Sequence, residues 1–186
     1  MESVIKWVEG VPQGDAWYAL RVRSNFEKLT VAHLESRGYA PFLPLYKSRR
    51  TWSDRLKAID LPLFSGYVFC RFDLHNRLAV VSCPGVVTVV GAGKRPIPIE
   101  EQEIDAIRSI AASRYPAEPW PFLQSGQRVR IIRGSLVGVE GLLMSIRKVH
   151  RLVVSVSLLQ RSVSVEIDRD WVTPVSAVPS FVERAG

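Results

Sequence analysis

Cysteine is scarce in this sequence, and clusters of metal-binding side chains are missing. The only two cysteines, Cys70 and Cys83, do not form a CxxC motif. A disulfide framework or a zinc site is therefore not expected, and both thiols are expected to be free and buried. The three histidines, His33, His75 and His150, are scattered along the chain. Without further ligands at a workable spacing, no metal site is expected either.

Long apolar runs and a secretory signal are also missing. No stretch approaches the roughly 18 to 20 consecutive apolar residues that a membrane helix needs. The first ten residues, MESVIKWVEG, lack the charged and apolar regions of a signal peptide. We therefore expect a cytoplasmic protein that makes no contact with a membrane.

The sequence also lacks the common catalytic motifs. The sequence has no glycine-rich phosphate loop, no HExxH motif and no nucleophile elbow. The best enzymatic alternative is a protein that cleaves or modifies nucleic acid with Asp54, Asp60 or Asp73, but no carboxylate cluster accompanies them. We therefore expect a protein that binds rather than catalyses, and that uses no cofactor.

Positive charge is what the sequence has in excess. Lysine and arginine number 25 against 18 aspartates and glutamates, which gives a formal net charge of +7. Such an excess favours a polyanion or an acidic protein surface as the partner. The chain of 186 residues is 47% hydrophobic, enough to bury one medium core or two small ones.

The pattern of residues 16–113 predicts an α/β sandwich, an antiparallel sheet flanked by helices. Aromatic and branched residues run together in AWYALRV (16–22) and GYVFCRF (66–72), and a third strand is predicted over 86–90. The charged stretch KSRRTWSDRLK (47–57) is typical of the exposed tip of a long hairpin. The strands and this hairpin would form one sheet-containing domain.

Two helices are predicted to flank that sheet. NFEKLTVAHLESRG (25–38) has Ser24 and Glu27 at the spacing of a capping box, and Gly38 as a stop signal. The second helix lies within PIPIEEQEIDAIRSIAAS (96–113), where acidic residues crowd the first turn and isoleucines recur at helical spacing. A shorter helix, ended by proline and glycine, would precede the strand at 86–90.

The composition changes after the second helix. RYPAEPWPF (114–122) holds three prolines in nine residues and predicts a linker. Five short strands follow in about fifty residues, with alternating apolar and polar positions in SVSVEI (162–167), and this pattern predicts a small closed β-barrel. The expected boundaries are 1–15 for a leader, 16–113 for the sandwich, 114–123 for the linker, 124–176 for the barrel and 177–186 for a tail.

The order of these motifs resembles the NusG family of transcription elongation factors. WYALRV, NFEKLTVAHLESRG, PLFSGYVFCRF, VSCPGVVTVVG, GQRVRIIRGSLVGVEG and SVSVEI follow one another at the family's spacing. The resemblance implies an amino-terminal α/β sandwich (NGN domain) and a carboxy-terminal five-stranded barrel with a KOW motif. Within the family, the stretch KSRRTWSDRLKAIDLPLFSGYVFCRFD resembles the specialised RfaH-like and capsule-operon antiterminators. RfaH-type factors carry a His-Thr-Thr contact, of which this chain has only His75.

The resemblance also implies a function. It predicts a transcription elongation and antitermination factor that binds bacterial RNA polymerase across the clamp and suppresses pausing or termination. Phe64 and Tyr67 match the aromatic residues that dock on the clamp coiled coil of the largest subunit, by the logic of a helix in an apolar groove. The residues alone equally allow both rings to be ordinary core. The alternative function is a ribosomal or general RNA-binding protein that acts through its barrel.

Nucleic acid is the second expected partner, as non-template DNA or nascent RNA. Arg21 and Arg23 lie on the first predicted strand, and Arg23 matches a position that faces the non-template strand in RfaH-like factors. The hairpin tip mixes cations with one aromatic ring, which suits phosphates and an unpaired base, although a solvated hairpin end has the same composition. The candidates in the tip are Lys47, Arg49, Arg50, Trp52, Arg55 and Lys57.

The barrel is expected to have a partner of its own. In the family, an apolar pair of loops meets a ribosomal protein or a termination factor. The matching residues here are Leu136, Val139, Leu158 and Leu159, where aliphatic side chains replace the usual aromatic ones. Arg128, Arg130 and Arg133 would line a cationic face that binds RNA or only faces solvent.

Overall fold

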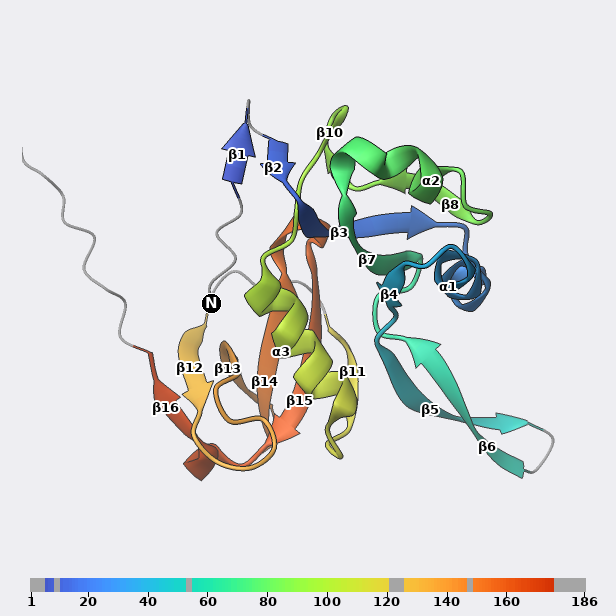
Figure 1. Cartoon of the computed structure of the whole chain (residues 1–186). Coiled ribbons are helices and arrows are strands. Elements are labelled where there is room, and N and C mark those ends of the chain that lie inside the picture. The colour runs from blue at the N-terminus through green and yellow to red at the C-terminus, as the bar shows by residue number, and fades with distance from the viewer. Residues whose placement is uncertain (1–5, 9–10, 53–54, 121–125, 147–148, 176–186) are drawn as a thin grey trace, which may run out of the picture.

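The computed structural model describes residues 6–8, 11–52, 55–120, 126–146 and 149–175. It has an amino-terminal sheet with helices on both faces and a carboxy-terminal body made of strands (Figure 1). The two predicted classes of domain are therefore confirmed. A small antiparallel pair, β1 (Lys6–Val8) and β2 (Val11–Gln13), precedes the first body.

The amino-terminal body is built on a four-stranded antiparallel sheet. Its order is β4 (Ala40–Phe42), β7 (Tyr67–Asp73), β3 (Asp15–Val22) and β8 (Val86–Val89). The central strand β7 is paired with β3 over its whole length, from Asp15 opposite Asp73 to Arg21 opposite Tyr67. Because side chains alternate across a strand, each strand supplies residues to two separate cores.

The helices divide between the two faces of this sheet. On one face, Tyr18, Leu20 and Cys70 pack with Leu34 of α1 (Glu27–Ser36) and Val80 of α2 (Arg77–Val81), the latter preceded by the short turn η1 (Leu74–Asn76). On the other face, Trp17 and Ala19 of β3 pack with α3 (Glu101–Ala112), which buries the predicted stripe Ile104, Ile107 and Ile110. No helix among the described residues is long and apolar enough to cross a membrane.

Two hairpins extend from this body. β5 (Leu45–Trp52) and β6 (Arg55–Pro62) form the long hairpin that the charged stretch predicted, and it projects away from both bodies (Figure 1). β9 (Gly91–Ala92) and β10 (Arg95–Pro96) form a much shorter hairpin between β8 and α3.

The carboxy-terminal body contains the five predicted strands. They are β12 (Gln127–Ile131), β13 (Glu140–Ile146), β14 (Val149–Val156), β15 (Arg161–Ile167) and β16 (Val172–Pro174), with short turns η2 (Ser157–Leu159) and η3 (Arg169–Trp171) between the last three. A sixth strand, β11 (Ala117–Trp120), joins them, and the order is β11-β15-β14-β13-β12-β16. Among the residues that the structure describes, β11 and β16 are thus the outer strands and do not pair with each other.

Two local expectations were wrong. Residues 117–120, expected in the linker, form the edge strand β11, where Pro119 is tolerated because an edge strand leaves half of its backbone groups unpaired. The capping box does not form either, since α1 begins after Phe26 without a side-chain cap. Glu27 is instead buried and turned toward the segment before β7.

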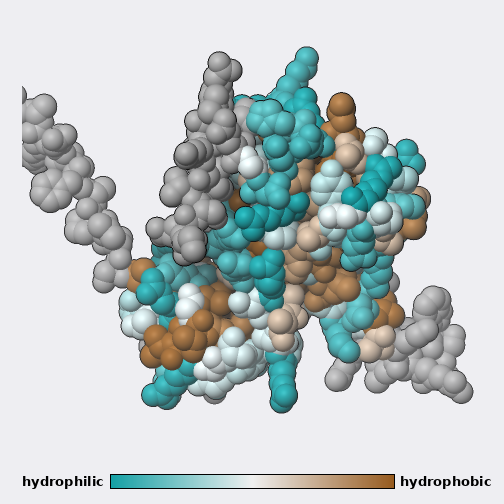
Figure 2. Space-filling model, viewed as in Figure 1, coloured by the Kyte–Doolittle hydropathy of each residue, from teal (hydrophilic) through white to brown (hydrophobic). Residues whose placement is uncertain are grey.

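The two bodies pack against each other, with α3 in front of β14 and β15 (Figure 1). One continuous apolar core includes the isoleucines of α3 and the barrel residues Leu152, Val154 and Val163. The outward side of α3 is hydrophilic, while hydrophobic residues gather at the end of the barrel near the β12–β13 connection (Figure 2). The barrel therefore lies on the face of the sandwich that carries α3.

Candidate functional site

The turn in PLFSGY connects the long hairpin to β7 and is held from three sides. Leu63 donates its backbone N–H to the carbonyl of Pro44 at 2.9 Å, and Tyr67 donates to the carbonyl of Phe64 at 3.1 Å. Gly66 has a φ of +83°, which favours glycine. Its N–H donates to Oε1 of Glu27 at 2.8 Å, and its carbonyl accepts from Val22 at 2.9 Å. These bonds fix the apolar residues of the turn relative to α1 and β3.

Phe64 lies inside the core. Only 1% of its surface is exposed, and its ring meets Phe69 edge to face with centroids 5.4 Å apart. Phe69 in turn packs against Phe42 at 6.0 Å. This arrangement fits the interpretation of Phe64 as an ordinary core residue, because a ring buried in this way has almost no surface left for a partner.

Tyr67 is placed differently. It is half-buried at the end of β7, and the guanidinium of Arg161 from the barrel lies over its ring, 5.4 Å from the centroid. A hollow of about 370 Å³ opens beside it, with Leu63 on the sandwich side and Pro119, Trp120 and Leu159 on the barrel side. The hollow next to the PLFSGY turn is therefore lined by residues of both bodies.

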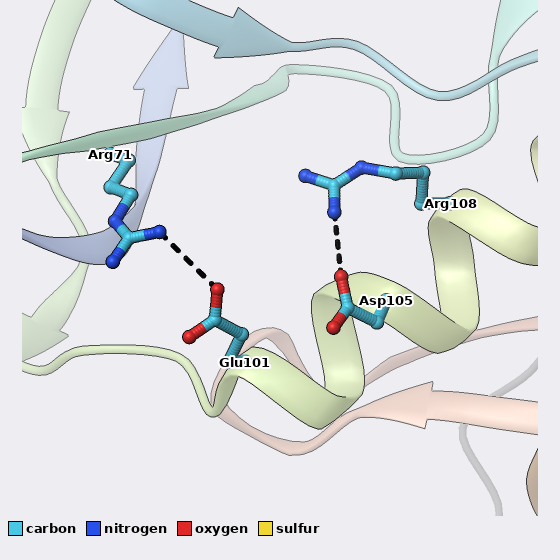
Figure 3. Close-up of polar contacts among 4 residues, drawn as sticks. All are labelled: Arg71, Glu101, Asp105 and Arg108. Carbon is cyan, nitrogen blue, oxygen red and sulfur yellow. Dashed lines mark hydrogen bonds and ion pairs between the residues drawn. The ribbon is translucent and has the colours of Figure 1, made fainter. Parts of the chain in front are cut away.

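The polar contacts of α3 lie within the helix and also reach the sandwich and the barrel. Figure 3 shows Arg71 of β7 donating to Glu101 at 3.3 Å, and Arg108 donating to Asp105 at 2.6 Å. Arg108 also lies 5.4 Å from the ring centroids of Trp17 and Phe42. Toward the barrel, the backbone N–H of Ser157 donates to Glu103 at 3.3 Å, at the side of a groove of about 1090 Å³ between α3 and the barrel.

The predicted nucleic-acid residues fall into two groups. Arg21 and Arg23 are exposed, and Arg21 is the direct cross-strand partner of Tyr67. Lys47 is exposed on the hairpin, opposite Asp60. The remaining hairpin candidates lie on β5 and β6, with side chains outside the described part of the structure: Arg49, Arg50, Trp52, Arg55 and Lys57. The structure thus brings Arg21, but not Lys47, next to Tyr67 in the sheet.

Three of the four predicted barrel-partner residues point inward. Leu136, Val139 and Leu159 are 1%, 7% and 8% exposed, and Leu158 is half-buried. The expectation that they form an exposed apolar surface is therefore not met in this arrangement. The exposed apolar residues of the same connection are Ile132 and Val137, at 48% and 60%. Sequence reasoning missed these two, although the alternation in SLVGV could have indicated that Val137 faces away from its neighbours.

The groups with shifted pKa values are two buried thiols and one carboxylate that accepts a backbone hydrogen bond. Burial raises the pKa of the Cys70 thiol to about 12, and burial also raises the pKa of Cys83, so both free thiols stay protonated. The backbone N–H of His75 donates to Asp73 at 2.9 Å and lowers the pKa of that carboxyl. No group of three or more potential metal ligands occurs among the described residues. Asp54, from the enzymatic alternative, lies outside them.

Known proteins similar to this chain agree with this architecture. The family described as "NusG: Transcription termination factor nusG" matches residues 15–108. A protein of Campylobacter jejuni named transcription termination/antitermination protein NusG is 32% identical over 114 residues, 60% of this chain and 64% of that protein. The protein of the same name from Borreliella burgdorferi is 28% identical over 177 residues, 82% of this chain and 95% of that protein.

A solved structure shows that the fold is shared as well. It reports domain interaction in Thermotoga maritima NusG, and it superposes with a TM-score of 0.54 at 22% identity over 87% of this chain and 98% of that one. The match to the Campylobacter protein spans less than two thirds of that protein's length. The family's own pattern matches residues 15–108, which is half of this chain. The chain belongs to the NusG family.

Proposed function

We propose that this protein is a transcription elongation and antitermination factor that binds bacterial RNA polymerase through its sandwich. The observation that carries the proposal is Tyr67, a half-buried aromatic residue on the sandwich side of a hollow between the two bodies, in the part of the chain that matches the family. Aromatic residues in such hollows are common anchors of protein interfaces. Relatives named transcription termination/antitermination protein support the same process.

The partner surface is the clamp coiled coil of the largest polymerase subunit. An apolar surface accepts one face of a partner helix, and Leu63 and Tyr67 would offer such a surface on the sandwich once the barrel residues that share the hollow have moved away. Phe64 supports this surface from beneath, because its ring is packed between the turn and Phe69. The clamp helix can reach Tyr67 only when Arg161 and the barrel have moved away from it.

The effect on transcription is a shift between polymerase states, with no chemical step. A factor that prefers the closed clamp by about 1.4 kcal/mol changes the ratio of closed to open clamp tenfold. Arg21 and Arg23 add contacts to the phosphates of non-template DNA or nascent RNA, since both side chains are exposed and Arg21 neighbours Tyr67. The barrel, released from the sandwich, recruits a ribosomal protein or a termination factor.

The alternative, RNA binding through the barrel, has weaker support. Two of the three arginines expected on its cationic face share one carboxylate: Arg130 donates to Glu140, and Arg128 lies 3.7 Å from it. This pairing removes part of the charge that phosphates would need. On the sandwich, Arg21 and Arg23 are exposed and neither forms an ion pair with another described residue.

Replacement of Tyr67 tests the proposal. We expect Tyr67→Ala to weaken binding to purified bacterial RNA polymerase at least tenfold, in line with the loss of an aromatic anchor. Tyr39→Ala is the matched control, because Tyr39 is half-buried against the opposite face of the sheet. Circular dichroism would confirm that both variants are folded. Unchanged polymerase binding by Tyr67→Ala, or no binding by the original protein, would favour the RNA-binding alternative.

A further inference from the structure

The turn before α1 directs the side chain of Glu27 into the sandwich. The backbone N–H of Phe26 donates to the carbonyl of Arg23 at 3.0 Å and closes this turn. Within it, Asn25 has a φ of +65°, a conformation that few residues other than glycine adopt. Glu27 is 5% exposed, whereas Phe26 is 38% exposed, which reverses the usual preference of these residue types. A backbone outlier that buries a charge points to a functional role.

The buried carboxylate of Glu27 bonds to the PLFSGY turn. Its Oε1 accepts the backbone N–H of Gly66 at 2.8 Å, across 39 positions of the sequence. A hydrogen bond to a carboxylate is stronger than one to a neutral acceptor, and a buried charge is stabilised only by such contacts. Glu27 also lies in the first turn of α1, where the helix dipole favours a negative charge. The local fold thus accommodates an acid whose hydrogen bond goes to a distant turn.

Gly66 is bonded through both of its backbone polar groups. Its N–H donates to Glu27 of α1, and its carbonyl accepts the N–H of Val22 at 2.9 Å, at the end of β3. The residue that follows Gly66 is Tyr67, the first residue of β7, whose side chain borders the hollow between the two bodies. The bonds of Gly66 therefore fix the point where the chain enters β7, directly before the proposed anchor.

The turn needs such bonds to keep one shape. Gly66 has a φ of +83°, and a glycine is free to adopt many other backbone conformations. The bond from the N–H of Tyr67 to the carbonyl of Phe64 lies within the turn, so it does not fix the turn relative to the rest of the sandwich. Without Glu27, Gly66 would keep its bond to Val22 but lose its bond to α1. The orientation of the peptide before Tyr67 would then be held from one side only.

We propose that Glu27 is a positioning residue for the binding of the partner: through Gly66 it holds the PLFSGY turn, and with it Tyr67, in the geometry that the partner meets. Glu27 itself touches no partner, because it is buried beneath the turn. A preformed surface binds more tightly, since less conformational entropy is lost on binding. The inference rests on the proposed function for the identity of the partner, whereas the hold of Glu27 on the turn is a property of this chain alone.

Amide hydrogen exchange in the full-length protein tests this hold without any partner. Glu27→Ala removes the acceptor of Gly66, whereas Glu27→Gln keeps an oxygen at the same reach. We expect exchange at Gly66 and Val22 to become about tenfold faster in Glu27→Ala and to stay near the original rate in Glu27→Gln. Val22 bonds to Gly66 and not to Glu27, so its rate reports whether the loss reaches β3. Glu35→Ala, an exposed carboxylate of the same helix, is the control.

The affinity for purified RNA polymerase without nucleic acid tests the consequence. Glu27→Ala should weaken binding about fivefold, because the turn is no longer preformed. Glu27→Gln should bind within about twofold of the original protein, which a role of the charge alone would not allow. In a Tyr67→Ala background, Glu27→Ala should cause no further weakening, because Glu27 acts through Tyr67. A general loss of stability would instead weaken binding equally in both backgrounds.

Three results would overturn the inference: unchanged exchange at Gly66 and Val22 in Glu27→Ala, faster exchange with unchanged polymerase affinity, or equal weakening with and without Tyr67. If Glu27→Ala does not fold, Glu27→Asp replaces it, because aspartate keeps the charge but is one methylene too short to reach Gly66. If the original protein does not bind polymerase, or Tyr67→Ala binds as tightly, the proposed function fails. The exchange rates then decide by themselves whether Glu27 holds the turn.

Discussion

Arg161 of the barrel lies over the ring of Tyr67 of the sandwich, with 5.4 Å between the guanidinium carbon and the ring centroid. Tyr67 is the first residue of β7, and Arg161 is the first residue of β15. The aromatic residue that carries the proposed function is thus covered by the chain's own second body. Packing of the two bodies and binding of a partner to Tyr67 would compete for the same ring.

Removal of this contact should loosen the packing of the two bodies. A cation–π contact contributes about 1 kcal/mol, so Arg161→Gln should raise the separated fraction about fivefold. Amide chemical shifts around Tyr67 would report the change. Arg108→Gln is the control, because Arg108 lies over Trp17 and Phe42 within the sandwich. Equal shifts around Tyr67 in both variants would contradict a specific role of Arg161.

The buried carboxylate of Glu27 should matter more for stability than the exposed one of Glu35. Glu27 is 5% exposed and accepts the N–H of Gly66, so Glu27→Ala leaves that donor without its partner. We expect a loss of about 2 kcal/mol in the free energy of unfolding, measured by urea denaturation. Glu35→Ala, on the same helix, should stay within about 0.5 kcal/mol of the original protein. Similar losses in both variants would mean that the Gly66 bond contributes little.

Gly85 should not tolerate a side chain. Its φ is +92°, and an added Cβ would lie 2.3 Å from the hydroxyl of the fully buried Thr30. Gly85→Ala should therefore lower the free energy of unfolding by about 3 kcal/mol, from backbone strain and this clash together. Gly38→Ala is the control: its φ is +82°, but nothing lies within 4 Å of the added Cβ. Strain alone should cost about 1 to 2 kcal/mol there, and equal losses would exclude the clash.

Stability should fall at alkaline pH. Burial, with a smaller effect of Asp73, raises the pKa of Tyr18 from 10.0 to about 12, and burial raises that of Cys70 from 9.0 to about 12. The unfolded chain then releases these protons at lower pH than the folded protein does. The stabilisation is complete below about pH 9 and is lost as the pH rises toward 12.

Tyr18→Phe isolates one of these groups. One pKa unit corresponds to about 1.4 kcal/mol, so the loss through Tyr18 is at most about 2.7 kcal/mol. In urea denaturation between pH 8 and pH 11, the variant should lose less stability per pH unit than the original protein. Parallel curves for the two proteins would show that the buried phenol makes no contribution.

Binding to nucleic acid should depend on salt through Arg21 and Arg23. Both side chains are exposed, and each phosphate contact releases counterions from the strand. For a single-stranded oligonucleotide, each Arg→Ala substitution should reduce the slope of log affinity against log salt by about 0.7. Arg133→Ala on the exposed side of the barrel is the control. If the barrel substitution reduced the slope and the sandwich substitutions did not, the RNA-binding alternative would gain support.

Regular elements with a strong local pattern were predicted well from the sequence. The strands β3 and β7, the helix α3 with its isoleucine stripe, and the five strands after the linker all lie where apolar periodicity indicated them. Periodicity succeeds there because each element buries one face, and that requirement is written into neighbouring residues. The family was identified on the same basis, from the order of these elements.

Features that depend on distant segments were predicted poorly. Glu27 has the spacing of a capping residue, yet it bonds to Gly66, which is 39 residues away. The resemblance placed Leu136 and Val139 on a loop that meets a partner, yet both side chains are buried here, and the N–H of Ile131 bonds to the carbonyl of Val139 at 2.9 Å. Local spacing cannot reveal which of several partners a side chain will meet.

The sequence by itself determined the two folding units and the positions of their strands and helices along the chain. It also determined which aromatic and basic residues are available for binding. Each of these follows from the order of neighbouring side chains. Only the tertiary structure decided which of these residues are accessible. Phe64 is sealed, Tyr67 lies under Arg161, and the proline-rich segment pairs with β15. The physical reason is that exposure depends on long-range packing of one body on the other, and that packing joins residues almost a hundred positions apart.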